Sequence, residues 1–175
     1  MSITTTQSSV PVFNQMLGSM SIWLDKAEAF CTAKKIGETV LPNTRLAADM
    51  LPMARQVQLA CDFAKNAVAR LAGVEPMKFE DTETTLPQLK DRIARALAYI
   101  NSLPAKDIEA GISREITFPA GPDRKGMMSG ADYLLHFAMQ HFYFHTTMTY
   151  AILRHCGVEL GKRDFLGAIP GFKMV

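Results

Sequence analysis

Two histidines one helical turn apart carry the clearest chemical signal in this sequence. His141 and His145 stand at positions i and i+4, a spacing that points both imidazoles to the same side of a helix. Such a pair can chelate one divalent metal ion if a third ligand converges from another segment. The candidates for that third ligand are Asp62, Cys61, Asp25 and Glu28. We predict a metal site of His141, His145 and Asp62; the alternative is a hydrogen-bonded pair of core histidines without a metal ion.

The same region also suggests acid–base chemistry. A carboxylate beside an imidazole and a phenol can move protons in a reaction. In such a site His145 would be the general base, Asp62 its partner, and Tyr143 the group that polarises a small substrate. The alternative is that these groups, together with Gln56 and Gln58, hydrogen-bond one another inside the fold and fix the register of the helices.

A second, smaller cluster is basic. Arg154 and Lys162 flank the predicted end of a helix, where cations are stabilised by the helix dipole. They could also bind an anion, so we keep an anion site at Arg154 and Lys162 as a hypothesis. The three cysteines have no Cys-x-x-Cys spacing and are interpreted as reduced packing residues, which is typical of a cytoplasmic protein.

Helical periodicity indicates which elements must position these groups. Apolar residues recur every three or four positions over about 10–35, 49–73, 86–100 and 129–155, which predicts four amphipathic helices. Ser8 or Ser9 is expected to cap the first helix and Asp49 the second. Residues 112–118 alternate between apolar and polar, so a strand is expected there, with a short partner strand at 125–127.

The predicted fold is therefore mostly α. It is a four-helix bundle in one domain, residues 1–175 with a core of 10–167, and it has a small β-hairpin between the third and fourth helices. The tail, residues 157–175, contains apolar residues throughout and is expected to pack on the bundle.

Charge and hydropathy exclude several partners. A net charge of +2 on 175 residues is too balanced for nucleic acid as the main partner. No uncharged apolar stretch reaches the length of about 18 residues that a membrane span needs. An isolated hairpin is marginal in water, and the helix at 129–155 is apolar on two sides. Both features favour a homodimer.

Two blocks of sequence point to a known family. The first block is RLAADMLP at 45–52 followed by QVQ at 56–58; the second is YFH at 143–145, YAILRH at 150–155 and GKRDFLG at 161–167. These blocks resemble the bacterial family catalogued as domain of unknown function nineteen-ninety-three, which is similar to the DinB/YfiT-like four-helix bundles. Many of those bundles hold a divalent metal ion through three histidines and form dimers. The resemblance implies a DinB-like fold, and His145 is the one histidine that matches a family position.

Two functions remain open at this point. The first is an uncharacterised protein with a polar cleft between the second and fourth helices, acting as a DinB-like metal-assisted hydrolase or thiol transferase on a small molecule. The second is a non-catalytic, dimeric binding or assembly module without a metal ion. No cofactor other than the divalent metal ion of the first function is indicated.

Overall fold

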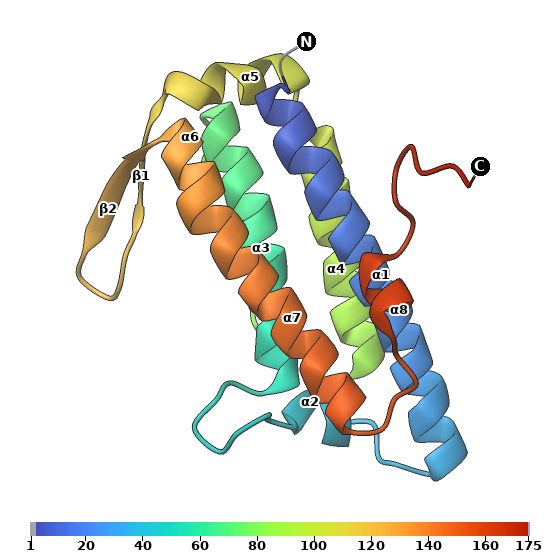
Figure 1. Cartoon of the computed structure of the whole chain (residues 1–175). Coiled ribbons are helices and arrows are strands. Elements are labelled where there is room, and N and C mark those ends of the chain that lie inside the picture. Colours follow the sequence, from blue (N-terminus) through green and yellow to red (C-terminus); the bar gives the residue numbers. More distant parts are fainter. Residues whose placement is uncertain (1–2, 175) are drawn as a thin grey trace.

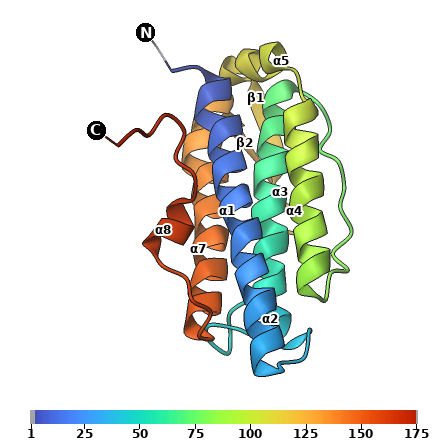
Figure 2. The same cartoon turned by 90° about the vertical axis from the view of Figure 1, so that its right-hand side faces the viewer.

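Four long helices pack along their lengths to form the body of the protein (Figures 1 and 2). The computed structural model describes residues 3–174. The long helices are α1 (Thr5–Lys34), α3 (Met53–Ala72), α4 (Leu86–Ser102) and α7 (Met139–His155). Helix α1 packs against α4 and α7, and α3 packs against the same two helices from the other side. Helices α1 and α7 run in the opposite direction to α3 and α4 (Figure 1).

Shorter elements connect these helices. They are α2 (Val40–Asn43), α5 (Ala105–Glu109), the 3-10 turn η1 (Ala110–Ser113), α6 (Gly130–Asp132), the π-helical turn η2 (Tyr133–Ala138), α8 (Lys162–Leu166), and the strands β1 (Glu115–Pro119) and β2 (Lys125–Ser129). The mostly α fold with a hairpin before the last long helix is therefore confirmed. The predicted fourth helix consists of α6, η2 and α7 in direct succession.

Helix starts differ from the predicted ones. Helix α1 begins at Thr5, because Thr4 and Gln7 form a capping box: the backbone N–H of Gln7 donates to Thr4 Oγ1 at 3.2 Å, and that of Thr4 donates to Gln7 Oε1 at 3.1 Å. The predicted caps Ser8 and Ser9 lie inside the helix. Helix α3 begins at Met53 rather than at Asp49, since a proline at position 52 disfavours helical backbone in the residues just before it.

The hairpin is short and firmly anchored at its base. Its strands pair antiparallel, with Phe118 opposite Gly126. Strand β1 begins at Glu115 and not at residue 112, because 110–113 forms the turn η1. A Cβ atom on Gly111 would lie 2.2 Å from the carbonyl oxygen of Leu71, and one on Gly130 would lie 1.8 Å from that of Gly111. These glycines let the hairpin base touch the end of α3.

The C-terminal tail packs on the bundle as predicted, up to Gly167. The indole Nε1 of Trp23 donates to the carbonyl oxygen of Asp164 at 2.8 Å, and the ring of Phe165 stacks on that of Trp23 with centroids 5.5 Å apart. Beyond this contact the side chains leave the body: Phe172 is 67% exposed. Figures 1 and 2 show this last stretch extending away from the helices.

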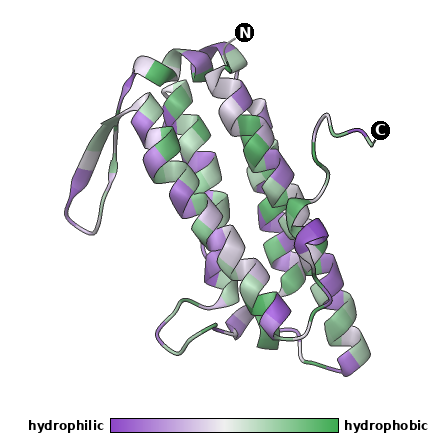
Figure 3. Cartoon of the chain, in the orientation of Figure 1, coloured by the Kyte–Doolittle hydropathy of each residue, from purple (hydrophilic) through white to green (hydrophobic). Residues whose placement is uncertain are grey.

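None of the helices described between residues 3 and 174 is both long and apolar enough to span a bilayer. Figure 3 shows the reason: polar and apolar residues alternate along each long helix, as expected for helices with one face toward a protein core.

A buried guanidinium joins α3, α4 and the segment between them. The side chain of Arg92 on α4 is fully buried. Its Nη2 lies 3.0 Å from Asp62 Oδ1 and 2.9 Å from Asp81 Oδ1, and its Nη1 lies 3.1 Å from Glu83 Oε1. The same Nη1 donates to the carbonyl oxygen of Glu80 at 3.0 Å. Residues 73–85 are thereby tied to the side of α4, along which they run (Figure 2).

Lys65 on α3 extends this network. The residue is only 3% exposed. Its Nζ lies 3.2 Å from Asp62 Oδ1 and donates to Asn66 Oδ1 at 2.7 Å. It also lies 5.0 Å from the centroid of the Phe79 ring. The carboxylate of Asp62 therefore serves two buried cations.

Replacing Arg92 with alanine should lower the free energy of unfolding by about 3–5 kcal/mol, because the substitution leaves partly buried carboxylates without their cation. Urea unfolding followed by circular dichroism measures the loss. The matched control is Arg95→Ala on the same helix. Arg95 pairs with Asp91 at 3.8 Å near the surface, so about 0–1 kcal/mol is expected. Equal losses in the two variants would contradict the importance of the network.

Candidate functional site

His145 makes a hydrogen bond inside the seam between α3 and α7. Its Nδ1 lies 2.8 Å from Gln56 Oε1, and both residues are buried. The amide Nε2 of Gln56 donates to the carbonyl oxygen of Leu51 at 3.2 Å. Because Oε1 can only accept, the imidazole carries its proton on Nδ1 and donates it. Gln56 thus fixes the tautomer and the orientation of His145.

Burial governs the charge of this imidazole. Desolvation lowers the pKa of His145 to about 4, and the nearby His141 and Arg55 act in the same direction. Desolvation also lowers the pKa of His141. His145 is therefore neutral at pH 7, in keeping with its role as a hydrogen-bond donor to a neutral amide.

Phe63 is the α3 residue that faces the two histidines. Its ring stacks on the His141 ring, with centroids 4.4 Å apart and planes inclined by 8°, and lies 5.6 Å from the His145 ring. The two imidazole centroids are 6.4 Å apart. A phenyl ring therefore fills the position opposite the histidine pair where a metal ligand was predicted.

Asp62 does not join the histidines, which corrects the predicted metal site. Successive residues on a helix point about 100° apart, so a helix that turns Phe63 toward α7 turns Asp62 toward α4. There its carboxylate contacts Arg92 and Lys65. Within residues 3–174, no three side chains of the His, Cys, Asp and Glu types are grouped to hold a metal ion. The set His141, His145 and Asp62 is not brought together.

The predicted catalytic set His145, Tyr143 and Asp62 is separated for a similar reason. Tyr143 precedes His145 by two residues and so points about 200° away from it around α7. Tyr143 is 38% exposed, and its partial burial raises the pKa of its phenol. The seam between α3 and α7 holds a closed hydrogen bond and stacked rings in place of the predicted polar cleft.

The proposed anion-binding pair lies at the surface. Arg154 in the last turn of α7 and Lys162 in the first turn of α8 are both exposed. Neither side chain forms an ion pair of 4.0 Å or less with another residue of the 3–174 range. An anion site at Arg154 and Lys162 stays a prediction.

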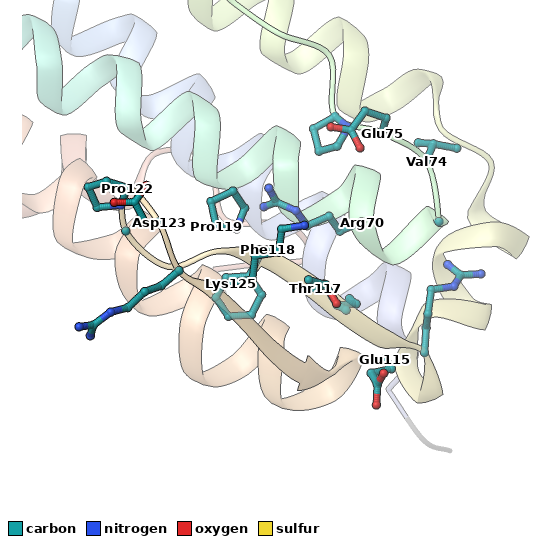
Figure 4. Close-up of a pocket in the computed structure, with 16 residues that line it drawn as sticks. Arg70, Val74, Glu75, Glu115, Thr117, Phe118, Pro119, Pro122, Asp123 and Lys125 are labelled. Atoms are coloured by element: carbon teal, nitrogen blue, oxygen red, sulfur yellow. The ribbon is translucent and has the colours of Figure 1, made fainter.

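A cavity that the sequence did not indicate opens beneath the hairpin (Figure 4). It has a volume of about 700 Å³. It lies between the C-terminal end of α3, the hairpin, and the first residues of the crossover segment, which is the connection 73–85 between α3 and α4. Its lining residues are Arg70, Gly73, Val74, Glu75, Pro76, residues 114–119 and residues 121–125. Because the walls come from two segments some forty residues apart, no local motif marks the cavity.

Two arginines reach into this cavity. Arg70 extends from α3 toward the strand that carries Phe118 (Figure 4), and its Nη1 donates to the phenolic oxygen of Tyr133 at 2.8 Å. Arg114 donates from Nη1 to the carbonyl oxygen of Leu71, in the last turn of α3. Two smaller hollows of about 200 and 290 Å³ also border Arg70 and continue along α3 past Asn66. Arg70 thus borders the cavity and both smaller hollows.

The lowered pKa of His145 makes stability depend on pH. Above pH 6.5, the ordinary histidine value, the imidazole is neutral in both the folded and the unfolded chain. Between pH 6.5 and about 4 the unfolded chain binds a proton that the folded chain excludes, so the free energy of unfolding should fall as the pH falls. In His145→Gln, which cannot titrate, this part of the loss should be absent. Denaturant unfolding at several pH values measures it, and an imidazole NMR titration of His145 with a midpoint near 6.5 would contradict it.

Comparison with known proteins agrees with the fold described above. A crystal structure of a DinB family member protein from Shewanella denitrificans superimposes with a TM-score of 0.87 at 42% sequence identity, covering 96% of this chain and 94% of that chain. No match was found among curated proteins. The sequence pattern described as "Domain of unknown function (DUF1993)" matches residues 6–166. The chain therefore belongs to the DUF1993 family and has the fold of a DinB family member.

Proposed function

We propose that this protein is a metal-independent binding module that takes a small molecule in the cavity beneath the hairpin. The observation that carries the proposal is the cavity itself. Its volume of about 700 Å³ lies inside the range of roughly 300–1,000 Å³ typical of ligand sites. Its walls combine exposed apolar residues, Val74, Pro119 and Pro122, with polar side chains such as that of Arg70, and such a combination is typical of ligand sites.

The donor groups of the α3–α7 seam fit a metal ion poorly, and this favours the binding module over the metal-assisted hydrolase or thiol transferase. His145 uses Nδ1 to hold Gln56, and Asp62 is shared by two cations. The ring of Phe63 covers one face of His141. The hydrogen bond from Nδ1 leaves Nε2 of His145 free. Asp62, however, is engaged by cations on the other side of α3, and no third ligand joins the histidine pair within residues 3–174.

A homodimer remains part of the proposal and stays a prediction. The last long helix and the preceding turn expose large apolar side chains, Leu135, Tyr143 and Phe144, and the hairpin exposes Met127. Exposed apolar groups of this size favour association with another surface.

Closing the cavity tests the proposal. Small-molecule fragments that bind should shift the amide NMR signals of Val74, Ile116 and Phe118. In Thr117→Trp an indole would occupy the cavity, and we expect fragment binding to drop at least roughly tenfold because the bound position is filled. The matched control is Thr147→Trp, at an exposed position of α7, which should bind fragments as the wild type does. Fragments that shift mainly the His141 and His145 signals would contradict the proposal.

Adding metal ions tests whether the function is independent of a metal. A ligand present at about one hundred times its Kd stabilises a folded protein by about 2.7 kcal/mol. We expect no such gain with zinc, nickel or manganese ions, because Asp62 is held by Arg92 and no third ligand joins His141 and His145 within residues 3–174. Thermal unfolding of tag-free protein with and without each ion is the measurement. A metal-dependent rise in Tm that is lost in His145→Ala would overturn the metal-independent function.

A further inference from the structure

Two half-buried arginines give the inside of the hairpin cavity its charge. Arg70 and Arg114 line the cavity. Among residues 3–174, no carboxylate oxygen lies within 4.0 Å of either guanidinium. The other charged residues that border the cavity are exposed at its rim: the carboxylates Glu75, Glu115 and Asp123 and the cations Arg124 and Lys125. The interior is therefore positive and the rim is mixed.

The two arginines have different roles. Arg114 donates to the carbonyl oxygen of Leu71, so it neutralises the negative end of the α3 dipole. The guanidinium of Arg114 also lies directly over Gly73, where an added Cβ would be 2.7 Å from its Nη1. The guanidinium of Arg114 is thus held at the C-terminal end of α3.

Arg70 does not donate to a backbone carbonyl at the end of α3. Although it stands in the last turn of α3, its one hydrogen bond within residues 3–174 goes to the hydroxyl of Tyr133. Tyr133 is fully buried and comes from η2, so it holds the guanidinium from behind. A guanidinium carries five N–H donors in a rigid plane, and most of those on Arg70 stay available to a ligand.

We infer that the cavity binds a small carboxylate with an apolar body, and that Arg70 is the residue that anchors the carboxylate group. This inference rests on the proposed function and names the ligand class of that site. A planar guanidinium pairs with a carboxylate through two parallel hydrogen bonds. The exposed apolar lining residues Val74, Pro119 and Pro122 supply surface for the apolar body. Arg114 is held by the end of α3, so within the described residues Arg70 is the interior cation left for a ligand. One guanidinium balances the charge of a monoanion but not that of a dianion, which favours a carboxylate over a phosphate monoester.

Matched probes test the ligand class. We would titrate the protein with 3-phenylpropionate, its neutral amide 3-phenylpropionamide, and phenyl phosphate, and follow amide NMR shifts of the cavity residues. The carboxylate should bind roughly tenfold more tightly than the amide, since a charge-assisted bidentate pair is about twice as strong as neutral hydrogen bonds. The phosphate should bind more weakly than the carboxylate.

Variants assign the preference to Arg70. In Arg70→Gln the carboxylate and the amide should bind equally. In Tyr133→Phe, which keeps the ring but removes the hydroxyl, the carboxylate-to-amide preference should shrink several-fold while amide affinity stays constant; a purely structural role of Tyr133 would change both affinities together. Arg163→Gln, at an exposed position on α8, is the control for net charge and should leave the preference unchanged.

Three results would overturn the inference. They are equal binding of carboxylate and amide to the wild type, tighter binding of phenyl phosphate, and no binding of the carboxylate at the cavity. The first result leaves the proposed function intact, because a ligand still occupies the cavity. Small-molecule binding at the cavity, which is the proposed function, fails when the fragments also leave the cavity empty, so the two failures can be told apart.

Discussion

The buried guanidinium of Arg92 constrains both the fold and the choice of functional site. A charge removed from water has to be paired and hydrogen-bonded, and Arg92 meets this requirement with carboxylates from α3 and from the crossover segment. Helices α3 and α4 run in the same direction, so a long connection must return along the bundle, and Arg92 holds that connection in place. One of the recruited carboxylates is Asp62, which is thereby turned away from α7.

That orientation of Asp62 has consequences at the opposite face of α3. Since Asp62 faces α4, its neighbour Phe63 faces α7 and stacks on His141. The polar partner of His145 is Gln56, about two turns before Phe63 on the same face of α3. The seam is closed by a neutral hydrogen bond and aromatic contacts. The open, polar space of the molecule lies instead where the hairpin base touches the end of α3 through Gly111 and Gly130.

Periodicity predicted the fold because packing of amphipathic helices is a regular, local signal. In the helix predicted over 49–73, the apolar residues that recur every three or four positions are all buried: Met53, Val57, Ala60, Cys61, Ala64, Val68 and Leu71. The site was harder, yet part of it could be predicted. Arg92 stands three residues after Leu89 and four before Ala96, on the apolar face of α4, so a buried cation in need of carboxylates was foreseeable. The rotation of about 200° between Tyr143 and His145 also follows from helix geometry alone.

The hairpin cavity could not be predicted from the sequence, because it depends on how residues near Arg70 and residues near Phe118 meet in three dimensions.

A shared fold does not imply a shared site, and this chain shows how the two come apart. A metal site at the α3–α7 seam would require a carboxylate or a further imidazole on the face of α3 that carries Phe63 and Gln56. The one acidic side chain near that face, Asp62, cannot serve a metal ion and Arg92 at once. If it moved to the histidines, Arg92 would lose its partner on α3, and Lys65 would lose the one carboxylate that pairs with it among residues 3–174. Because an uncompensated buried cation is strongly destabilising, the ion network and a metal centre built on Asp62 exclude each other in this chain.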